Sequence, residues 1–215
     1  SHGSMDNILI EEFDERATLI SGSPKPLSMM EGIDNSFDLC VFLGYHGRPG
    51  KMSSVMDHTY SSSTVYEVRI NGKAMSEAGL NGRLAGYFGV PVAIVTGDQN
   101  AISCAKEELN KHIGVQVKEA IGRNSAKLTP FPKIVDKIRE GVAKVFEEKN
   151  DLKTTVEKDE IKLEVEFNKT TMAEMANLIP GAKLVNGRTI SYKSEDYLEI
   201  YRSFRAMLGL ASTIN

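Results

Sequence analysis

The chain contains no tryptophan, has two cysteines, and has no apolar run of the roughly 20 residues that a membrane-spanning helix requires. We therefore expect no membrane partner. Its 26 basic residues are outnumbered by 29 acidic ones, and the net charge of −3 argues against a nucleic-acid partner. Cys40 and Cys104 do not form a CxxC pair, which indicates buried thiols and a cytoplasmic protein.

The composition is that of a globular protein, with 41% hydrophobic and 26% charged residues. Segments with strand and helix character alternate along the chain, which favours an α/β fold. We expect a mostly parallel central sheet flanked by helices, with a smaller α+β C-terminal part. The charged stretch Lys149–Asp159 is the best candidate boundary, and it divides the chain into residues 1–150 and 151–215.

Apolar patterning predicts the individual elements. Leu39–Leu43 and Pro91–Val95 are short continuous apolar runs, typical of buried strands, whereas Val65–Ile70 alternates and ends in the turn signal Asn71-Gly72. Further strands are expected at Ala17–Ser21, Val115–Ala120, Ile161–Phe167, Ala182–Val185 and Arg188–Tyr192. Helices are expected from about Met75 to Phe88, at Ala101–Leu109, from Pro130 to about Glu148, at Thr170–Leu178 and at Ser194–Leu210.

Three glycines recur at helical spacing in the helix that begins near Met75. Gly79, Gly82 and Gly86 each lower its intrinsic stability. Their periodicity predicts that another part of the protein, either the sheet or a second subunit, packs closely against this helix.

Two histidines and a carboxylate mark a candidate site. His46 follows the strand Leu39–Leu43, at the kind of sheet edge where ligands bind in open α/β folds. His58 lies in the long loop Gly47–Ser63, and Glu77 lies at the start of a helix. Imidazole and carboxylate are zinc ligands, and a further histidine suits proton transfer. The alternative is two ordinary loop histidines and a glutamate that interacts with the helix dipole.

Longer motifs carry a resemblance to a known family. GYHGRPG, VMDHTY and INGKAMSEAGLNGRLAGYFGVPVAIVTGD resemble the zinc-dependent D-aminopeptidase family of DppA type, as do LISGSPKPLSMMEGID upstream and the C-terminal stretch from EFNKTTMAEM onward. The resemblance spans nearly the whole chain in order. It implies an aminopeptidase that hydrolyses short peptides with an N-terminal D-amino acid, such as D-Ala peptides. It also implies that His46 and Glu77 are ligands in a two-zinc site and that His58 is catalytic.

The first residues allow two interpretations. Ser1-His2-Gly3-Ser4-Met5 is either an expression scar or the Ser-His-Gly-x-Met segment of the family. In the second case the resemblance makes His2 a third zinc ligand. The family also carries an Asp-x-Glu metal motif that precedes this histidine, and no such motif precedes His2 here. Because each zinc ion takes about four ligands, we expect either an incomplete chain or a non-catalytic binding or assembly subunit.

The resemblance leaves further expectations open. Asn124 and Ser125 occupy a polar turn that lies near the active site in the family, and they are candidate substrate contacts. Arg48 and Lys51 are either solvated loop charges or ligands for a substrate carboxylate, and Asp98 is either a helix cap or a residue near the site. Family members form homo-oligomeric rings, decamers, and are linked to peptide transport. A related metal-dependent amidase or deacylase is the competing enzyme hypothesis.

Overall fold

A three-stranded parallel sheet lies at the centre of the fold. This computed structural model describes residues 8–214. The strands β1 (Cys40–Tyr45), β4 (Val92–Gly97) and β5 (Ile113–Gln116) pair in the order β1-β4-β5. All six residues of β4 are buried, as expected for a central parallel strand that is covered on both faces.

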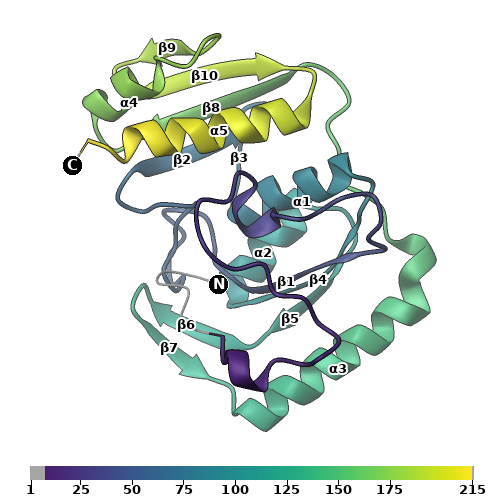
Figure 1. Cartoon of the computed structure of the whole chain (residues 1–215). Coiled ribbons are helices and arrows are strands. Elements are labelled where there is room, and N and C mark those ends of the chain that lie inside the picture. The colour runs from purple at the N-terminus through teal and green to yellow at the C-terminus, as the bar shows by residue number, and fades with distance from the viewer. Residues whose placement is uncertain (1–7, 215) are drawn as a thin grey trace.

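Three helices cover the faces of the parallel sheet. α1 (Glu77–Tyr87) and α2 (Gln99–Glu108) lie on one face, and α3 (Phe131–Glu148) lies on the other (Figure 1). Val115 of β5 and Val145 of α3 belong to a small separate apolar cluster on the α3 side. The predicted α/β fold with a parallel sheet flanked by helices is confirmed.

A second sheet of five antiparallel strands has the order β3-β2-β8-β10-β9. Its strands are β2 (Val65–Ile70), β3 (Lys73–Ala74), β8 (Ile161–Phe167), β9 (Lys183–Asn186) and β10 (Thr189–Ser194). Because β2 pairs with β8, this sheet contains strands from both sides of the segment Lys149–Asp159. The division into residues 1–150 and 151–215 stays a prediction, and the sheet joins the two parts.

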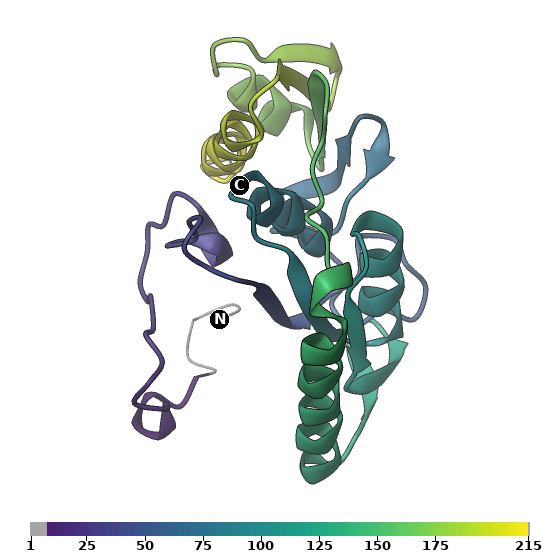
Figure 2. The same cartoon turned by 90° about the vertical axis from the view of Figure 1, so that its right-hand side faces the viewer.

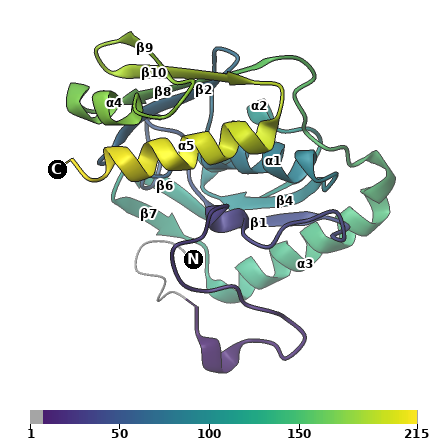
Figure 3. The same cartoon turned by 45° about the horizontal axis from the view of Figure 1, so that its top comes forward.

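Helices α4 (Thr170–Ala176) and α5 (Tyr197–Ala211) pack on the second sheet, and α5 also contacts α1 (Figure 3). The main apolar core therefore runs without a break from α1 to α5, and Leu84, Val165 and Phe204 are among its members. This core joins the two sheets into one body.

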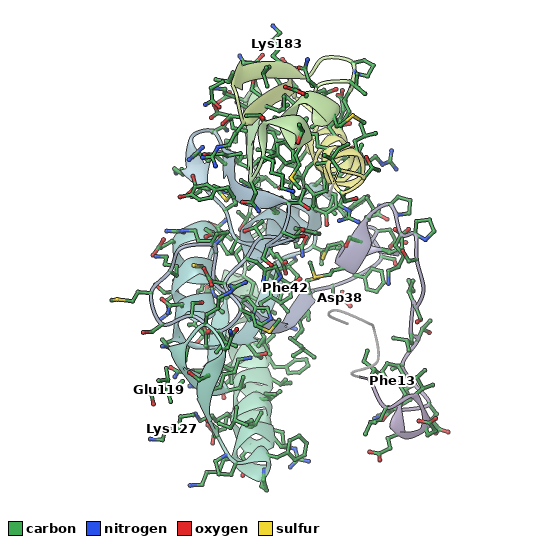
Figure 4. All side chains as sticks on the ribbon, turned by 90° about the vertical axis from the view of Figure 1, so that its left-hand side faces the viewer. Phe13, Asp38, Phe42, Glu119, Lys127 and Lys183 are labelled. Atoms are coloured by element: carbon green, nitrogen blue, oxygen red, sulfur yellow. The ribbon has the colours of Figure 1, made fainter. Side chains whose placement is uncertain are left out.

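The remaining segments lie mostly at the surface, although Leu27 and Met30 are buried in the main core. The hairpin of β6 (Lys118–Gly122) and β7 (Ser125–Leu128) pairs Glu119 with Lys127, and both side chains extend from its outer surface (Figure 4). The 3-10 turns are η1 (Ile10–Glu12), η2 (Ser28–Met30) and η3 (Lys149–Asp151). Residues 8–39 run beside the body as a mostly exposed arm (Figure 2), with Phe13 on its outer limb (Figure 4).

Three strand predictions differ from the structure. Ala17–Ser21 is not a strand, because it lies on the exposed arm and pairs with no other strand of residues 8–214. The segment Val115–Ala120 is divided between β5 and β6, since Val117 N donates to the carbonyl of Gly97 (3.0 Å) at the point where the chain changes sheets. The expected buried strand at Leu39–Leu43 is the edge strand β1, and Leu43 is 64% exposed.

The glycines of α1 allow neighbouring segments to approach closely. A Cβ atom on Gly82 would overlap Leu109, and one on Gly86 would overlap the carbonyl oxygen of Thr155. The predicted close packing is present, but the sequence offered the sheet or a second subunit as the partner, whereas the nearest atoms belong to Leu109 after α2 and to Thr155 before β8. The resulting position of α1 fixes the location of Glu77 at its first turn.

Gly86→Ala should therefore lower the free energy of unfolding by about 1–3 kcal/mol, because the new methyl group has no space beside Thr155. Gly209→Ala in α5 is the matched control: no atom lies within 4 Å of its added Cβ, so higher helix propensity should stabilise the protein by up to about 1 kcal/mol. Urea unfolding measures both. Equal effects at the two positions would contradict the packing described here.

Candidate functional site

Three side chains named from the sequence converge where β1, the long loop and α1 meet. His46 follows β1, His58 lies in the loop, and Glu77 is the first residue of α1. His58 Nε2 is 3.2 Å from Glu77 Oε1, and the centres of the two imidazole rings are 5.2 Å apart. The exposed fractions are 8% for His46, 6% for His58 and 4% for Glu77, so the cluster is buried. The structure brings these three residues together, while their roles stay predictions.

The other sequence candidates lie elsewhere. His2 is outside the described residues 8–214. Asn124 and Ser125 are exposed at the tip of the β6–β7 hairpin. Their neighbour Arg123, which the sequence analysis did not single out, lines a cavity beside His58. Only the fold reveals this, because nothing in the local pattern distinguishes Arg123 from other hairpin residues.

Backbone carbonyls orient both imidazoles. His46 Nδ1 lies 2.8 Å from the carbonyl oxygen of Val55, and His58 Nδ1 lies 2.5 Å from that of Met56. A carbonyl oxygen is an acceptor, and a ring nitrogen donates to it only when that nitrogen carries a hydrogen. In the neutral form of each ring, Nδ1 therefore carries the hydrogen and Nε2 carries the lone pair. Nε2 is thus the atom of each histidine that is able to bind a metal or exchange a proton.

Asp98 holds the loop that orients His46. Its Oδ1 accepts from the backbone N–H groups of Asn100 (2.9 Å) and Ala101 (2.8 Å), so it caps α2, as one of the two sequence interpretations predicted. Its Oδ2 accepts from Val55 N (2.7 Å), whose carbonyl in turn holds His46. One buried carboxylate thereby links the start of α2 to the orientation of the histidine.

A second buried carboxylate, Glu108, fixes the start of α1. Its Oε2 accepts from the backbone N–H (2.9 Å) and the hydroxyl (2.6 Å) of Ser76, the residue that caps α1. Its Oε1 accepts from Arg48 of the long loop (2.8 Å), and Arg48 also pairs with Glu107 (2.7 Å). These contacts favour a structural role for Arg48, because its guanidinium is already bound by two carboxylates. They also hold Glu77, the neighbour of Ser76, in place.

The charges in the cluster suit a bound cation. Burial lowers the pKa of His46, and the neighbouring positive charges of His58 and Lys118 act in the same direction. Burial also acts to lower the pKa of His58, but its hydrogen bond to Glu77 and the charge of Glu77 raise it overall. Burial acts to raise the pKa of Glu77, but the interactions with His58 and with Tyr60 N lower it overall. Glu77 is therefore ionised and His46 neutral at pH 7, which are the protonation states that metal ligands need.

The donor chemistry fits zinc, which binds imidazole nitrogen and carboxylate oxygen. Within residues 8–214, no group of three or more His, Cys, Asp or Glu side chains is arranged to hold a metal ion. His46 and Glu77, the ligands that the sequence resemblance implies, are both oriented by contacts behind them. Such support is typical of the surroundings of metal ligands.

A cavity of about 220 Å³ adjoins His58. Its lining comes from the long loop, β2, the β6–β7 turn and the residue after β8: Pro49, Asp57, His58, Ser62, Val65, Tyr66, Arg123 and Asn168. Arg123 Nη1 donates to the backbone carbonyl of Asp57 (2.7 Å) and also contacts the carboxylate of that residue. The cavity therefore has the size of a small molecule, and its wall carries the ion pair of Arg123 and Asp57.

Comparisons with known proteins give consistent results. A model of a D-aminopeptidase family matches residues 1–206. A D-aminopeptidase of Bacillus subtilis (strain 168) is 36% identical over 215 residues, which cover 98% of this chain and 77% of the relative. The chain is also similar to the solved structure of the Zn-dependent D-aminopeptidase DppA from Bacillus subtilis, described as a self-compartmentalizing protease, with a TM-score of 0.92 and 36% identity over 99% of this chain and 77% of that one.

Asp98→Asn tests the link between α2 and the loop. The amide has one acceptor oxygen, so either the cap or the bond from Val55 N is lost, and we expect the free energy of unfolding to fall by about 1–3 kcal/mol. Asp196 caps α5 at an exposed position and makes no second tie, so Asp196→Asn should change it by less than about 0.5 kcal/mol. Chemical denaturation compares the two, and equal losses would show that the bond from Val55 adds nothing.

Proposed function

The chain belongs to the D-aminopeptidase family, and we propose that it hydrolyses short peptides with an N-terminal D-amino acid, such as D-Ala peptides. Membership makes it a metallo-aminopeptidase, a hydrolase. The observation that carries the proposal is the buried cluster of His46, His58 and Glu77, in which an ionised carboxylate lies beside two oriented imidazoles. This is a set of residues that can hold a metal and move a proton at the same place.

We propose that the metal is zinc, since the solved relative is described as zinc-dependent, and that a complete subunit holds two ions. His46 and Glu77 would be ligands, together with His2, which lies outside the described residues. Zinc in such a site supplies Lewis-acid polarisation of a carbonyl group and makes a water molecule more acidic. The donor types and protonation states of His46 and Glu77 support this assignment.

His58 is assigned the catalytic role. Its Nδ1–H is held by the carbonyl of Met56, so Nε2 is the atom that takes up and releases a proton. Glu77 raises the pKa of His58, which allows this nitrogen to carry a proton near neutral pH. His58 acts either as a general acid and base or as a nucleophile, and both roles use the same atom.

The cavity beside His58 is the proposed substrate site. Its volume of about 220 Å³ suits a short peptide segment rather than a folded protein. Arg123 places guanidinium N–H groups on its wall, and guanidinium is well matched to the carboxylate at the end of a dipeptide. We propose that Arg123 binds that carboxylate, whereas Asn124 and Ser125 contact substrate from the adjacent turn.

We propose that the protein assembles into a homo-oligomeric ring, a decamer, with its sites facing an inner chamber. The relative described as self-compartmentalizing supports assembly. The described surface also carries large exposed apolar side chains on the β6–β7 hairpin and on α3: Ile121, Leu128, Phe131 and Phe146. Side chains of this kind are common in subunit contacts, and a chamber would admit short peptides.

A cytoplasmic location and a link to peptide transport stay predictions. The two cysteines form no disulfide, which fits a reducing compartment. No helix within residues 8–214 has the length and apolar character needed to cross a membrane.

The full-length protein should hydrolyse D-Ala-D-Ala, should be inactivated by a chelator and restored by zinc, and should leave N-acetylated D-Ala-D-Ala intact. His58→Ala should keep its zinc and lose at least about 100-fold in kcat, because the group that moves the proton is gone. His112→Ala is the control, since His112 bonds to Asn110 away from the cluster. Hydrolysis of N-acylated substrates alone would favour a deacylase instead.

Arg123→Ala should raise KM for D-Ala-D-Ala about 10- to 100-fold, the value of a hydrogen bond to a charged group. KM for D-alanine p-nitroanilide, which has no carboxylate, should stay within about twofold. Arg123 also holds the long loop through its bond to Asp57, and damage to the loop would impair hydrolysis of both substrates. Comparing the two substrates therefore separates a loss of carboxylate binding from damage to the loop. An equal loss on both substrates would rule out carboxylate binding by Arg123.

A further inference from the structure

Tyr60 has an unusual backbone conformation beside the cluster. Its φ of +65° lies in the left-handed region, which costs a residue other than glycine on the order of 1–2 kcal/mol. In this conformation Tyr60 N donates to Glu77 Oε1 at 2.8 Å. The strained residue therefore supplies one of the hydrogen bonds that fix the Glu77 carboxylate, on the same oxygen that faces His58.

The side chain of Tyr60 is held from two helices. Its hydroxyl donates to Asn81 Oδ1 of α1 (2.6 Å) and also contacts the Tyr201 hydroxyl of α5. Its ring packs edge-on against Phe204 with centroids 5.2 Å apart, and the guanidinium carbon of Arg205 lies 5.2 Å from its centroid. Three residues of α5 thus surround this ring, which explains how the protein maintains the unfavourable backbone conformation.

Asn81 connects this group to the other side of the site. Its Oδ1 also accepts from Tyr201 (2.9 Å), and its Nδ2 donates to the hydroxyl of Tyr45 (2.9 Å), the residue before His46. Asn81 is fully buried and Tyr201 is 1% exposed, so water does not compete for these bonds. The hydroxyls of Tyr45, Tyr60 and Tyr201 and the amide of Asn81 form a network behind the candidate ligands.

We infer that Tyr60 is a positioning residue for the metal ligand Glu77, and that α5 maintains its position through Tyr201. The inference depends on the proposed role of Glu77. The C-terminal helix touches no described ligand directly, yet it sets the geometry of one of them. Removing the Tyr201 hydroxyl weakens the hold on Tyr60, and the N–H bonded to Glu77 then loses its fixed direction.

Tyr197 provides a matched control on the same helix. Its hydroxyl donates to the carbonyl of Leu80 (2.9 Å), and Tyr197 is 5% exposed. It is therefore a buried tyrosine of α5 whose hydroxyl bonds to α1, as that of Tyr201 does. It lies outside the network around Tyr60 and lacks the further contacts that the Tyr201 hydroxyl makes with Tyr60 and with the carbonyl of Leu27. Substituting either tyrosine with phenylalanine removes one buried hydroxyl and lowers stability, and Tyr197→Phe does so without changing the surroundings of Tyr60.

The test measures zinc affinity of the full-length protein by competition with a chromophoric chelator, beside kcat and thermal unfolding. Tyr201→Phe and Tyr60→Phe should each weaken zinc binding about 10-fold, the lower end for contacts behind a ligand. Tyr197→Phe should leave zinc affinity within about twofold, although it also lowers Tm.

Two results would overturn the inference, and they are distinguishable. Equal loss of zinc affinity in Tyr201→Phe and Tyr197→Phe would mean that both tyrosines act through general stability, and the proposed function would stand. Failure of the wild-type protein to bind zinc would remove the proposed role of Glu77, and the positioning role of Tyr60 with it.

Discussion

A buried, ionised carboxylate is the constraint around which this fold is arranged. Glu77 loses its hydration, and such a loss is tolerated only when hydrogen bonds and opposite charge replace the water. Here the replacement comes from His58 Nε2 and from the N–H of Tyr60, at the first turn of α1. Both partners belong to the long loop, and the loop is itself held by hydrogen bonds to Asp98 and Glu108. The stability of the site is thus distributed over contacts that lie well away from it.

The long loop has no strand or helix of its own, but hydrogen bonds to other elements hold it in place. The start of α2 provides several of the ties: Asp98 accepts from Val55, and the side-chain amides of Gln99 and Asn100 both donate to the carbonyl of Ser53. Arg48, near the beginning of the loop, is bound to Glu108 at the end of the same helix. Contacts with α2 and its cap therefore help to set the conformation of the loop that carries His58.

Sequence patterns predicted the elements whose signals are local, and missed features that depend on distant partners. The alternation of Val65–Ile70 and the Asn71-Gly72 turn correctly predicted β2 and the hairpin after it. The apolar run at Leu39–Leu43 could not reveal that β1 is an edge strand with one uncovered face. Likewise, the motifs brought His46, His58 and Glu77 to attention, whereas the role of Tyr60 depends on a backbone angle and on α5, neither of which the local sequence encodes.

The pairing of β2 with β8 has a consequence for the order of folding. Val65 is in register with Phe167, so β2, which follows the long loop, cannot pair with β8 until the chain has been made as far as Phe167. Closing so long a loop is slow compared with forming helices and hairpins. Tyr201 lies later still in the chain, and its hydroxyl contacts that of Tyr60, whose backbone N–H donates to Glu77. During synthesis, the segments that carry His46, His58 and Glu77 are made before α5, so the contacts that hold Tyr60 beside Glu77 form only after α5 has been made.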